Sequence, residues 1–186
     1  MSSDPVEGIS RDDWAWLEGT VGSCLRGNPA VGAARGARLG LVCSAFNGSI
    51  TLRLLRGALD ALEAGGISGK MVTVSWVPGA FEIPITARRM ARNGGFDAIV
   101  CLGAVIRGGT PHFDYVAGEC AAGIRQVGLE TDTPVIFGVL TTDNLEQAME
   151  RSGGGPGNKG YESVMVGLEM VDLLGRQLAA TGRRSS

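Results

Sequence analysis

The chain has 186 residues, 44% of them hydrophobic, and a formal net charge of −2, which together indicate a folded domain. Its 30 glycines exceed the usual share, but with 7 prolines they stay below the level of low-complexity chains, which excludes disorder and collagen for most of the sequence. The weakly acidic balance argues against a nonspecific nucleic-acid binder. The longest apolar stretch, residues 98–106, is too short to span a bilayer, and the N-terminus lacks a signal-peptide pattern. We therefore expect a cytoplasmic protein with neither nucleic-acid nor membrane partners.

The four cysteines, Cys24, Cys43, Cys101 and Cys120, form no Cys-x-x-Cys pair, and two of them lie inside apolar runs. Such positions favour buried free thiols over metal ligands. Because the chain has a single histidine, His112, a zinc site would need scattered cysteines and carboxylates. We therefore expect no metal site.

The first 37 residues form an N-terminal extension that is rich in glycine, alanine and serine. Ser10 is suited to cap a short helix in which Trp14, Leu17 and Val21 share one face. We expect this helix to dock on its own subunit or on a neighbour, with a dedicated partner or cargo contact as the alternative. The glycines before residue 38 are expected to belong to a loose tail.

Four apolar runs of strand length follow, and their valine and isoleucine content is typical of strands covered on both faces of a parallel sheet. Between them apolar residues recur at helical spacing, and the glycine pairs 65–66 and 94–95 close two of the helices. Asp143 and Glu146 predict the capping box of a short helix, which breaks in the glycine-rich residues 153–157. The predicted strands are residues 38–45, 71–77, 98–106 and 134–140, and the predicted helices cover about residues 50–62, 83–91, 116–127, 143–151 and 160–180.

Strands and helices thus alternate four times, which is the pattern of an open α/β fold. We predict a single domain over residues 38–181: a three-layer, flavodoxin-like sandwich with a mainly parallel four-stranded sheet and helices on both faces. Residues 182–186 are predicted to be a flexible tail. Ligands of such folds bind beyond the carboxyl ends of the strands. Those ends carry residues 46–47, 78–82, 107–112 and 141–143.

The third of these strand ends contains the only histidine of the chain. If a helix begins near Pro111, the amides of Gly109 and Thr110 lie at its N-terminus, where a phosphate binds readily. Histidine exchanges protons near neutral pH, which suits His112 to proton relay. A glycine-rich turn beside a histidine is also a common structural feature, so this block alone does not establish a site. Dinucleotide, Walker A and serine-hydrolase motifs are absent from the sequence.

Other residues near the strand ends each allow two interpretations. Arg151 is either a bidentate phosphate ligand or a solvated cation at a helix end. Phe46 and Phe81 are either core aromatics or stacking platforms for a flat heterocycle. Glu82 is either a surface charge or an acceptor for a ligand hydroxyl. Spacing alone leaves these alternatives open.

Four blocks at these strand ends, within about residues 38–175, together resemble the lumazine synthases of riboflavin biosynthesis. The blocks are Phe46-Asn47, residues 77–84 (VPGAFEIP), residues 103–116 (GAVIRGGTPHFDYV), and residues 137–148 (FGVLTTDNLEQA) running on to Arg151, with Asn158-Lys159-Gly160 beyond. The resemblance implies a transferase that condenses 5-amino-6-(D-ribitylamino)uracil with 3,4-dihydroxy-2-butanone 4-phosphate. The products would be 6,7-dimethyl-8-ribityllumazine, phosphate and water, and no metal or organic cofactor would be needed.

The resemblance also implies a role for each candidate residue. His112 matches the proton-transfer histidine of the family, and Gly109, Thr110 and Arg151 match its phosphate site. The other candidates match residues around the ribitylaminouracil: Phe46 for stacking, Ala80, Phe81 and Glu82 for the ribityl chain, Ala104, Val105 and Ile106 for the pyrimidine, Phe137 from a neighbouring subunit, and Lys159 and Glu162 at the border.

Lumazine synthases form pentamers with active sites between subunits, and many assemble twelve pentamers into a hollow shell. Residues 153–160 resemble the form found in shell-forming members, so we expect a 60-subunit shell, with a free pentamer as the alternative and riboflavin synthase as a candidate partner. Two other functions stay open. A non-catalytic flavin or lumazine binder is disfavoured by the intact His112, Arg151 and Glu82, and an archaeal-type riboflavin synthase is disfavoured by the complete phosphate set.

Overall fold

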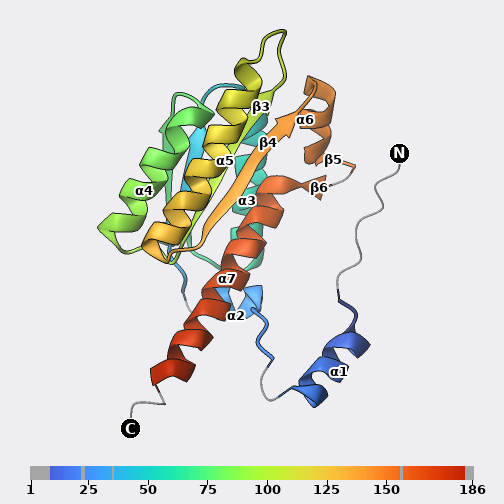
Figure 1. Cartoon of the computed structure of the whole chain (residues 1–186), viewed down its shortest axis with the longest axis vertical. Helices are drawn as coiled ribbons and strands as arrows, with labels where there is room; N and C mark the ends of the chain where they lie inside the picture. The colour runs from blue at the N-terminus through green and yellow to red at the C-terminus, as the bar shows by residue number, and fades with distance from the viewer. Residues whose placement is uncertain (1–8, 22–23, 35, 156, 183–186) are drawn as a thin grey trace.

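The computed structural model describes residues 9–21, 24–34, 36–155 and 157–182, with only the backbone for residues 34 and 178–182. Its main sheet has the strand order β2-β1-β3-β4, and every neighbouring pair is parallel (Figure 1). The α/β fold and the four-stranded parallel sheet are thereby confirmed. The four strands are β1 (Leu39–Ser44), β2 (Val72–Val77), β3 (Ala98–Ile106) and β4 (Val135–Thr142).

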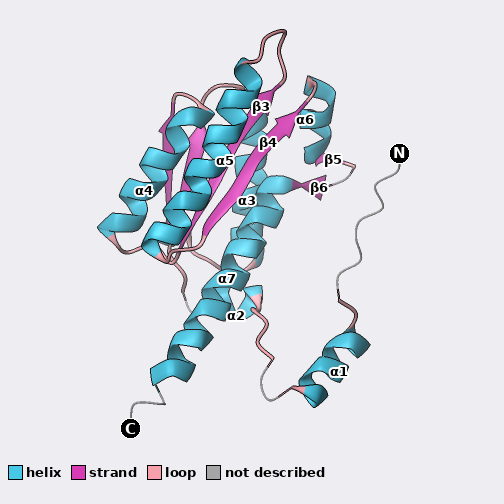
Figure 2. Ribbon diagram, in the orientation of Figure 1, coloured by secondary structure: helices cyan, strands magenta, loops and turns pink. Residues whose placement is uncertain are grey.

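Helices cover both faces of this sheet, as Figure 2 shows. Leu39 and Leu41 of β1 pack toward one face with α3 and α7, whereas Val42 packs toward the other face with α4 and α5. This alternation follows from the two-residue period of a strand and gives the chain two apolar core layers. The helices are α3 (Gly48–Ala64), α4 (Ile83–Asn93), α5 (His112–Thr131), α6 (Leu145–Arg151) and α7 (Lys159–Gly182), with 3₁₀ turns at Gly69–Met71 and Ala80–Glu82.

The strands differ in how well they are covered. All of β1 is buried, and so is all of β3 except Ile106. The edge strands β2 and β4 leave Val74, Trp76 and Phe137 exposed. The prediction of strands covered on both faces is therefore right for the central pair and wrong for the edges, because the helices of one chain cover mainly the middle of the sheet.

The N-cap of the short helix α6 lies one residue later than the sequence predicts. This cap is Asn144, whose side chain accepts from the Gln147 amide at 2.9 Å, and not Asp143. The Asp143 carboxylate instead accepts from Arg107 Nε at 3.0 Å. After α6 the chain makes a small antiparallel hairpin of β5 (Ser152–Gly154) and β6 (Gly157–Asn158), where the sequence predicts the helix break.

The N-terminal extension contains two helices, α1 (Arg11–Thr20) and α2 (Pro29–Ala34). The predicted cap of α1 is confirmed, since Ser10 Oγ accepts from the Asp13 amide at 3.1 Å. This helix buries none of its residues and lies apart from the sheet in Figure 1.

The segment around α2 is packed against α7. A Cβ atom added to Gly27 would lie 2.1 Å from the Glu169 carbonyl oxygen, and one added to Gly32 would lie 2.1 Å from that of Leu168. The loose-tail prediction is therefore wrong for these two glycines, because they allow backbone to touch backbone. The domain boundary at residue 38 stays a prediction, and the predicted tail beyond Gly182 lies outside the described residues.

Candidate active site

A hollow of about 700 Å³ lies beyond the carboxyl ends of β1, β2 and β3, and we call it the His112 hollow. It brings together most of the candidates that the sequence places at these strand ends, which confirms that they are neighbours in space. Gly109 lies between two of its lining residues in the chain. The hollow is lined by Phe46, Asn47, residues 78–82, residues 104–106, Gly108, Thr110, His112, Phe113, Tyr115 and Val116.

Hydrogen bonds beyond the strand ends hold the floor of this hollow. The Phe46 amide donates to the Pro78 carbonyl at 3.0 Å, which extends the β1–β2 pairing past the sheet. Asn47 adopts a left-handed conformation with φ 56° and donates from Nδ2 to the Ala104 carbonyl at 2.8 Å. Asn47 has no predicted role, although asparagine adopts this conformation more readily than most residues. The ends of three strands are thereby tied together.

Three aromatic rings of the hollow stay exposed, and two of them, Phe46 and Phe81, are predicted site residues. Phe46 is 71% exposed and Phe81 is 57% exposed, although both are large hydrophobic side chains. Exposure excludes the core-aromatic interpretation within the chain. It leaves both rings available as platforms for a flat ligand.

The loop that leads to His112 is open above its backbone. Gly108 and Gly109 have ordinary φ values, and a Cβ atom on either would have no neighbour within 4 Å. The fold of the described chain therefore does not require glycine at these positions. Helix α5 begins at His112, close to the predicted start, and no side chain caps it. This helix end is suited to an anion that approaches the backbone closely.

Arg107 fixes the start of this loop. Its guanidinium donates to Asp143 at 3.0 Å and to Asp114 at 3.1 Å, and it lies 4.1 Å from the centre of the Phe113 ring. The hydrogen bonds to Asp143 and then to Asp114 raise the pKa of Arg107 above its usual value. Because both carboxylates already engage this cation, it ties the loop to α5 and to the end of β4.

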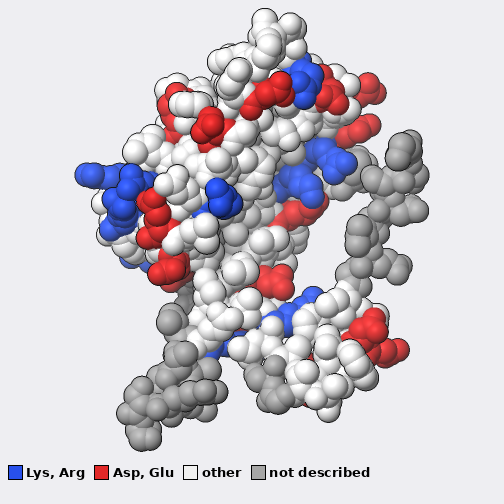
Figure 3. All heavy atoms as spheres, in the orientation of Figure 1, with Lys and Arg blue, Asp and Glu red and all other residues white. Residues whose placement is uncertain are grey.

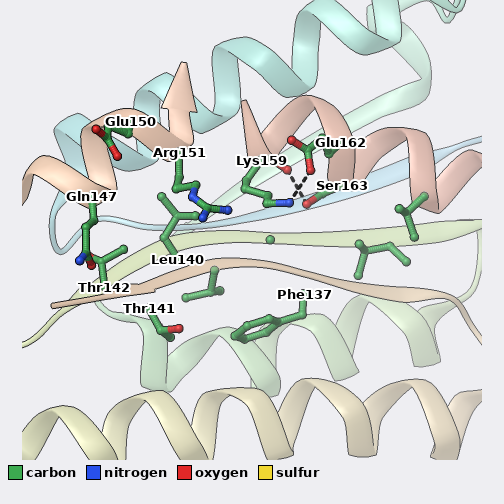
Figure 4. A pocket seen from close by; sticks show the side chains of 14 residues that line it. Phe137, Leu140, Thr141, Thr142, Gln147, Glu150, Arg151, Lys159, Glu162 and Ser163 are labelled. Carbon is green, nitrogen blue, oxygen red and sulfur yellow. Dashed lines mark hydrogen bonds and ion pairs between the residues drawn. The ribbon is translucent and has the colours of Figure 1, made fainter. Parts of the chain in front are cut away.

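A second hollow, of about 820 Å³, lies between β4, the end of α6 and the start of α7 (Figure 4). We call it the Arg151 hollow, and Arg151 and Lys159 both project into it. Lys159 is paired with Glu162, whereas Arg151 has no hydrogen-bond or ion-pair partner within the described residues. Its lining residues are 136–142, Gln147, Glu150, Arg151, Lys159, Glu162, Ser163 and Val166.

The two hollows share no lining residue. Within one chain, the structure does not bring Arg151 into the same hollow as Thr110, although both are candidates for one phosphate site. Phe137 and Lys159 likewise lie in the Arg151 hollow, away from the other candidates for the ribitylaminouracil. Each hollow therefore contains only part of the predicted site.

A family model described as 6,7-dimethyl-8-ribityllumazine synthase matches residues 36–175. The chain belongs to the lumazine synthase family. It is also similar to a 6,7-dimethyl-8-ribityllumazine synthase of Protochlamydia amoebophila (strain UWE25), with 62% identity over 137 residues that cover 74% of this chain and 80% of the relative. The chain is accordingly a transferase of riboflavin biosynthesis that forms 6,7-dimethyl-8-ribityllumazine, as the four sequence blocks predict.

The cysteines of this lumazine synthase are free thiols. Burial raises the pKa of Cys43 and Cys120 to about 12, and burial together with the neighbouring Cys120 and Cys43 raises that of Cys101 well above its ordinary value. These three thiols are therefore protonated at neutral pH, which confirms the buried-thiol prediction, while Cys24 is half-buried.

The described residues were also compared with the requirements of a metal site and of a membrane-spanning helix. Among the described residues, no group of three histidine, cysteine or acidic side chains is arranged to hold a metal ion. In the same part of the chain, no helix is both long and apolar enough to cross a membrane. On the face drawn in Figure 3, basic and acidic side chains are interspersed, in keeping with the net charge of −2.

Proposed function

We propose that this lumazine synthase forms each active site from the His112 hollow of one copy and the Arg151 hollow of a neighbouring copy. The observation that carries the proposal is the distribution of the candidate residues over two separate hollows. Neither hollow alone combines an aromatic platform, a proton-transfer group and a free cation. Brought together across an interface, they contain all three.

The His112 hollow binds 5-amino-6-(D-ribitylamino)uracil. The pyrimidine stacks on the exposed ring of Phe46. The end of β3, residues 104–106, offers backbone groups to the pyrimidine edge, and Glu82 accepts hydrogen bonds from the ribityl hydroxyls. Ala80 and Phe81 form the wall along the ribityl chain.

The phosphate of 3,4-dihydroxy-2-butanone 4-phosphate binds between the two copies. The open backbone at Gly109 and the hydroxyl of Thr110 contact it from one side. Arg151 of the other copy contacts it with a planar pair of donors that suits phosphate geometry. Because Arg151 has no partner within the described residues, it can bind the anion without first breaking an ion pair. Phe137 and Lys159 of that copy border the ribitylaminouracil.

The chemistry needs proton transfer and an anion site. The amine of the first substrate adds to the ketone, water leaves to give an imine, phosphate departs, and the second amine closes the ring with loss of a second water. His112 relays protons between these steps, and the phosphate site holds the leaving group as its bond breaks. Both substrates are reactive, so holding them in register supplies a large part of the acceleration, up to roughly 7–11 kcal/mol for well-oriented reactants.

The assembly in this proposal is a shell of 60 subunits, built from twelve pentamers. Two different surfaces that face each other make a head-to-tail contact, and such contacts close into a ring when the rotation allows it. The enzyme acts in the cytoplasm on small molecules, without a cofactor, and riboflavin synthase is a candidate partner. A free pentamer is the alternative assembly.

The first test mixes the purified protein with both substrates and follows the absorbance of the lumazine product. We expect a rate well above that of the spontaneous condensation. A rate equal to the spontaneous one would refute the proposed activity.

The shared site is tested by combining two impaired variants, His112→Ala and Arg151→Ala, in the same cells. If each site takes one hollow from each of two copies, about a quarter of the sites in a random mixture contain both intact hollows. We therefore expect the mixed protein to be more active than either variant alone. If each chain holds a complete site, the mixture will show only the average of the two variants.

A further inference from the structure

Two cations of the Arg151 hollow stand on either side of the β5–β6 hairpin. Arg151 directly precedes Ser152, the first residue of β5, and Lys159 directly follows Asn158, the last residue of β6. Ser152 and Asn158 are paired across this hairpin. The backbone positions of both cations therefore depend on one pair of residues.

The Asn158 side chain uses all its hydrogen-bonding groups to hold this region together. Its Nδ2 donates to the Arg53 carbonyl of α3 at 3.0 Å and to the Ser152 carbonyl at 3.1 Å. Its Oδ1 accepts from the amides of Gly160 at 2.8 Å and Tyr161 at 3.4 Å, in the first turn of α7. One amide group thus links α3, the end of α6 and the start of α7.

Ser152 forms the second attachment. It is 1% exposed, and its Oγ accepts from Arg53 Nε at 3.1 Å and donates to the Met149 carbonyl at 3.2 Å. Both ends of the hairpin are therefore fixed to Arg53 of α3, one through its backbone and the other through its side chain.

Glycines let these groups approach so closely. A Cβ atom added to Gly57 of α3 would lie 2.3 Å from Asn158 Cγ, and one added to Gly160 would lie 1.9 Å from the Leu54 carbonyl oxygen. Gly153 and Gly157 have φ values of 117° and 102°, which other residues rarely adopt. The hairpin, α3 and α7 therefore fit together in one arrangement.

We propose that Asn158 is a positioning residue, which with Ser152 sets the position and direction of Arg151 at the phosphate site. This inference rests on the proposed role of Arg151 in binding the phosphate of the substrate. Asn158 lines neither hollow, so it acts through its neighbours. A residue that only stabilises the fold would change the melting temperature and leave the two substrate KM values in their original ratio.

The test substitutes Asn158→Asp, which keeps the shape of the side chain but replaces two donors by an acceptor that faces two carbonyl groups. We expect the KM for the phosphate-bearing substrate to rise about tenfold, because buried hydrogen bonds of this kind are costly to lose. The KM for the aminouracil should stay within about twofold. Inorganic phosphate, used as a competing anion, should inhibit the variant about tenfold more weakly.

The matched control is Asn144→Asp, the same chemical change at the N-cap of α6. Asn144 uses its side-chain oxygen as an acceptor there, which aspartate supplies equally well. Both KM values should be unchanged in this control. A milder variant, Ser152→Ala, should raise the phosphate-substrate KM less than Asn158→Asp does, and it keeps the inference testable if Asn158→Asp does not fold.

Arg151→Ala separates the two ideas. If Arg151→Ala leaves the KM of the phosphate substrate unchanged, the proposed phosphate site is wrong. If Arg151→Ala raises that KM while neither Asn158→Asp nor Ser152→Ala does, the positioning role is wrong. In the Arg151→Ala background, Asn158→Asp should add little further effect, and a full additional tenfold rise would also overturn the inference.

Discussion

The two hollows differ in what builds them. The His112 hollow forms at the ends of three strands, where backbone hydrogen bonds fix the residues and three aromatic rings stay exposed. The Arg151 hollow forms between the edge strand β4 and the ends of two helices, where charged side chains project and one asparagine holds the backbone. The strand ends thus supply a platform for a flat ring, whereas the helix ends supply charge for an anion.

The same difference predicts how each hollow responds to substitution. In the His112 hollow, backbone hydrogen bonds between the strands fix the positions of the lining residues. Replacing one side chain leaves these bonds in place, so the effect of a substitution stays local. In the Arg151 hollow, the cations depend on the hairpin, so a change at Asn158 reaches residues on both sides of it. The variants below test this contrast.

The largest effect is expected for His112→Ala. General acid–base catalysis typically contributes a factor on the order of 10² or more, so kcat should fall by about 100-fold. Residual turnover above the spontaneous rate should remain, because Phe46 and the phosphate site still position the substrates. Steady-state kinetics with both substrates measures the change. If the variant turns over as fast as the intact enzyme, His112 is not the proton relay.

Arg151→Ala should have the next largest effect, and it should fall on the other substrate. Loss of a charge-assisted hydrogen-bond pair weakens binding about 10- to 50-fold, which raises the KM for the phosphate-bearing substrate. The matched control is Arg56→Ala, since Arg56 is exposed on α3 and lines neither hollow. An equal rise of the aminouracil KM in Arg151→Ala would contradict the proposal that Arg151 binds only the phosphate-bearing substrate.

Phe46→Ala should have a smaller effect, confined to the ring platform. Stacking of a base on an aromatic side chain is worth about 1–3 kcal/mol, so the aminouracil KM should rise about tenfold. Leu59→Ala on α3 also removes an exposed apolar side chain, outside both hollows, and serves as the control. An unchanged aminouracil KM in Phe46→Ala would show that the ring does not stack on the substrate.

The same contrast explains how far sequence analysis could go. The apolar runs and glycine pairs predict the strands and helices closely. The rule that ligands bind beyond the carboxyl ends of parallel strands is enough to predict that residues 78–82 and His112 lie at one site. Only the family resemblance assigned a role to Arg151, because a cation at a helix end has no distinctive pattern of its own.

The residues that sequence analysis missed act through long-range contacts. Asn158 is held by a carbonyl 105 positions earlier, and the Gly27 and Gly32 contacts join α7 to the N-terminal extension. No local period of the sequence encodes such contacts. Asp143 was assigned to a cap because its pairing with Arg107, 36 positions away, is equally invisible in local spacing.

The smallest effect on catalysis is expected from the three buried thiols, which act on the stability of the fold at alkaline pH. The three buried thiols lie in β1, β3 and α5, and burial raises the pKa of Cys43 and Cys120 to about 12. The folded state therefore keeps protons that the unfolded chain releases near its ordinary thiol pKa of about 8.5. This contribution to stability is complete below about pH 8.5 and is lost as the pH rises toward 12.

Urea unfolding at a series of pH values between 8 and 11 measures this loss, as a falling free energy of unfolding. In Cys120→Ala the decline should be shallower, because one of the protonated thiols is gone. Cys24→Ala, which changes the half-buried cysteine outside the sheet, should keep the original slope. If Cys120→Ala loses stability with pH as steeply as the intact enzyme, the thiol of α5 does not contribute, and the pH dependence belongs to other groups.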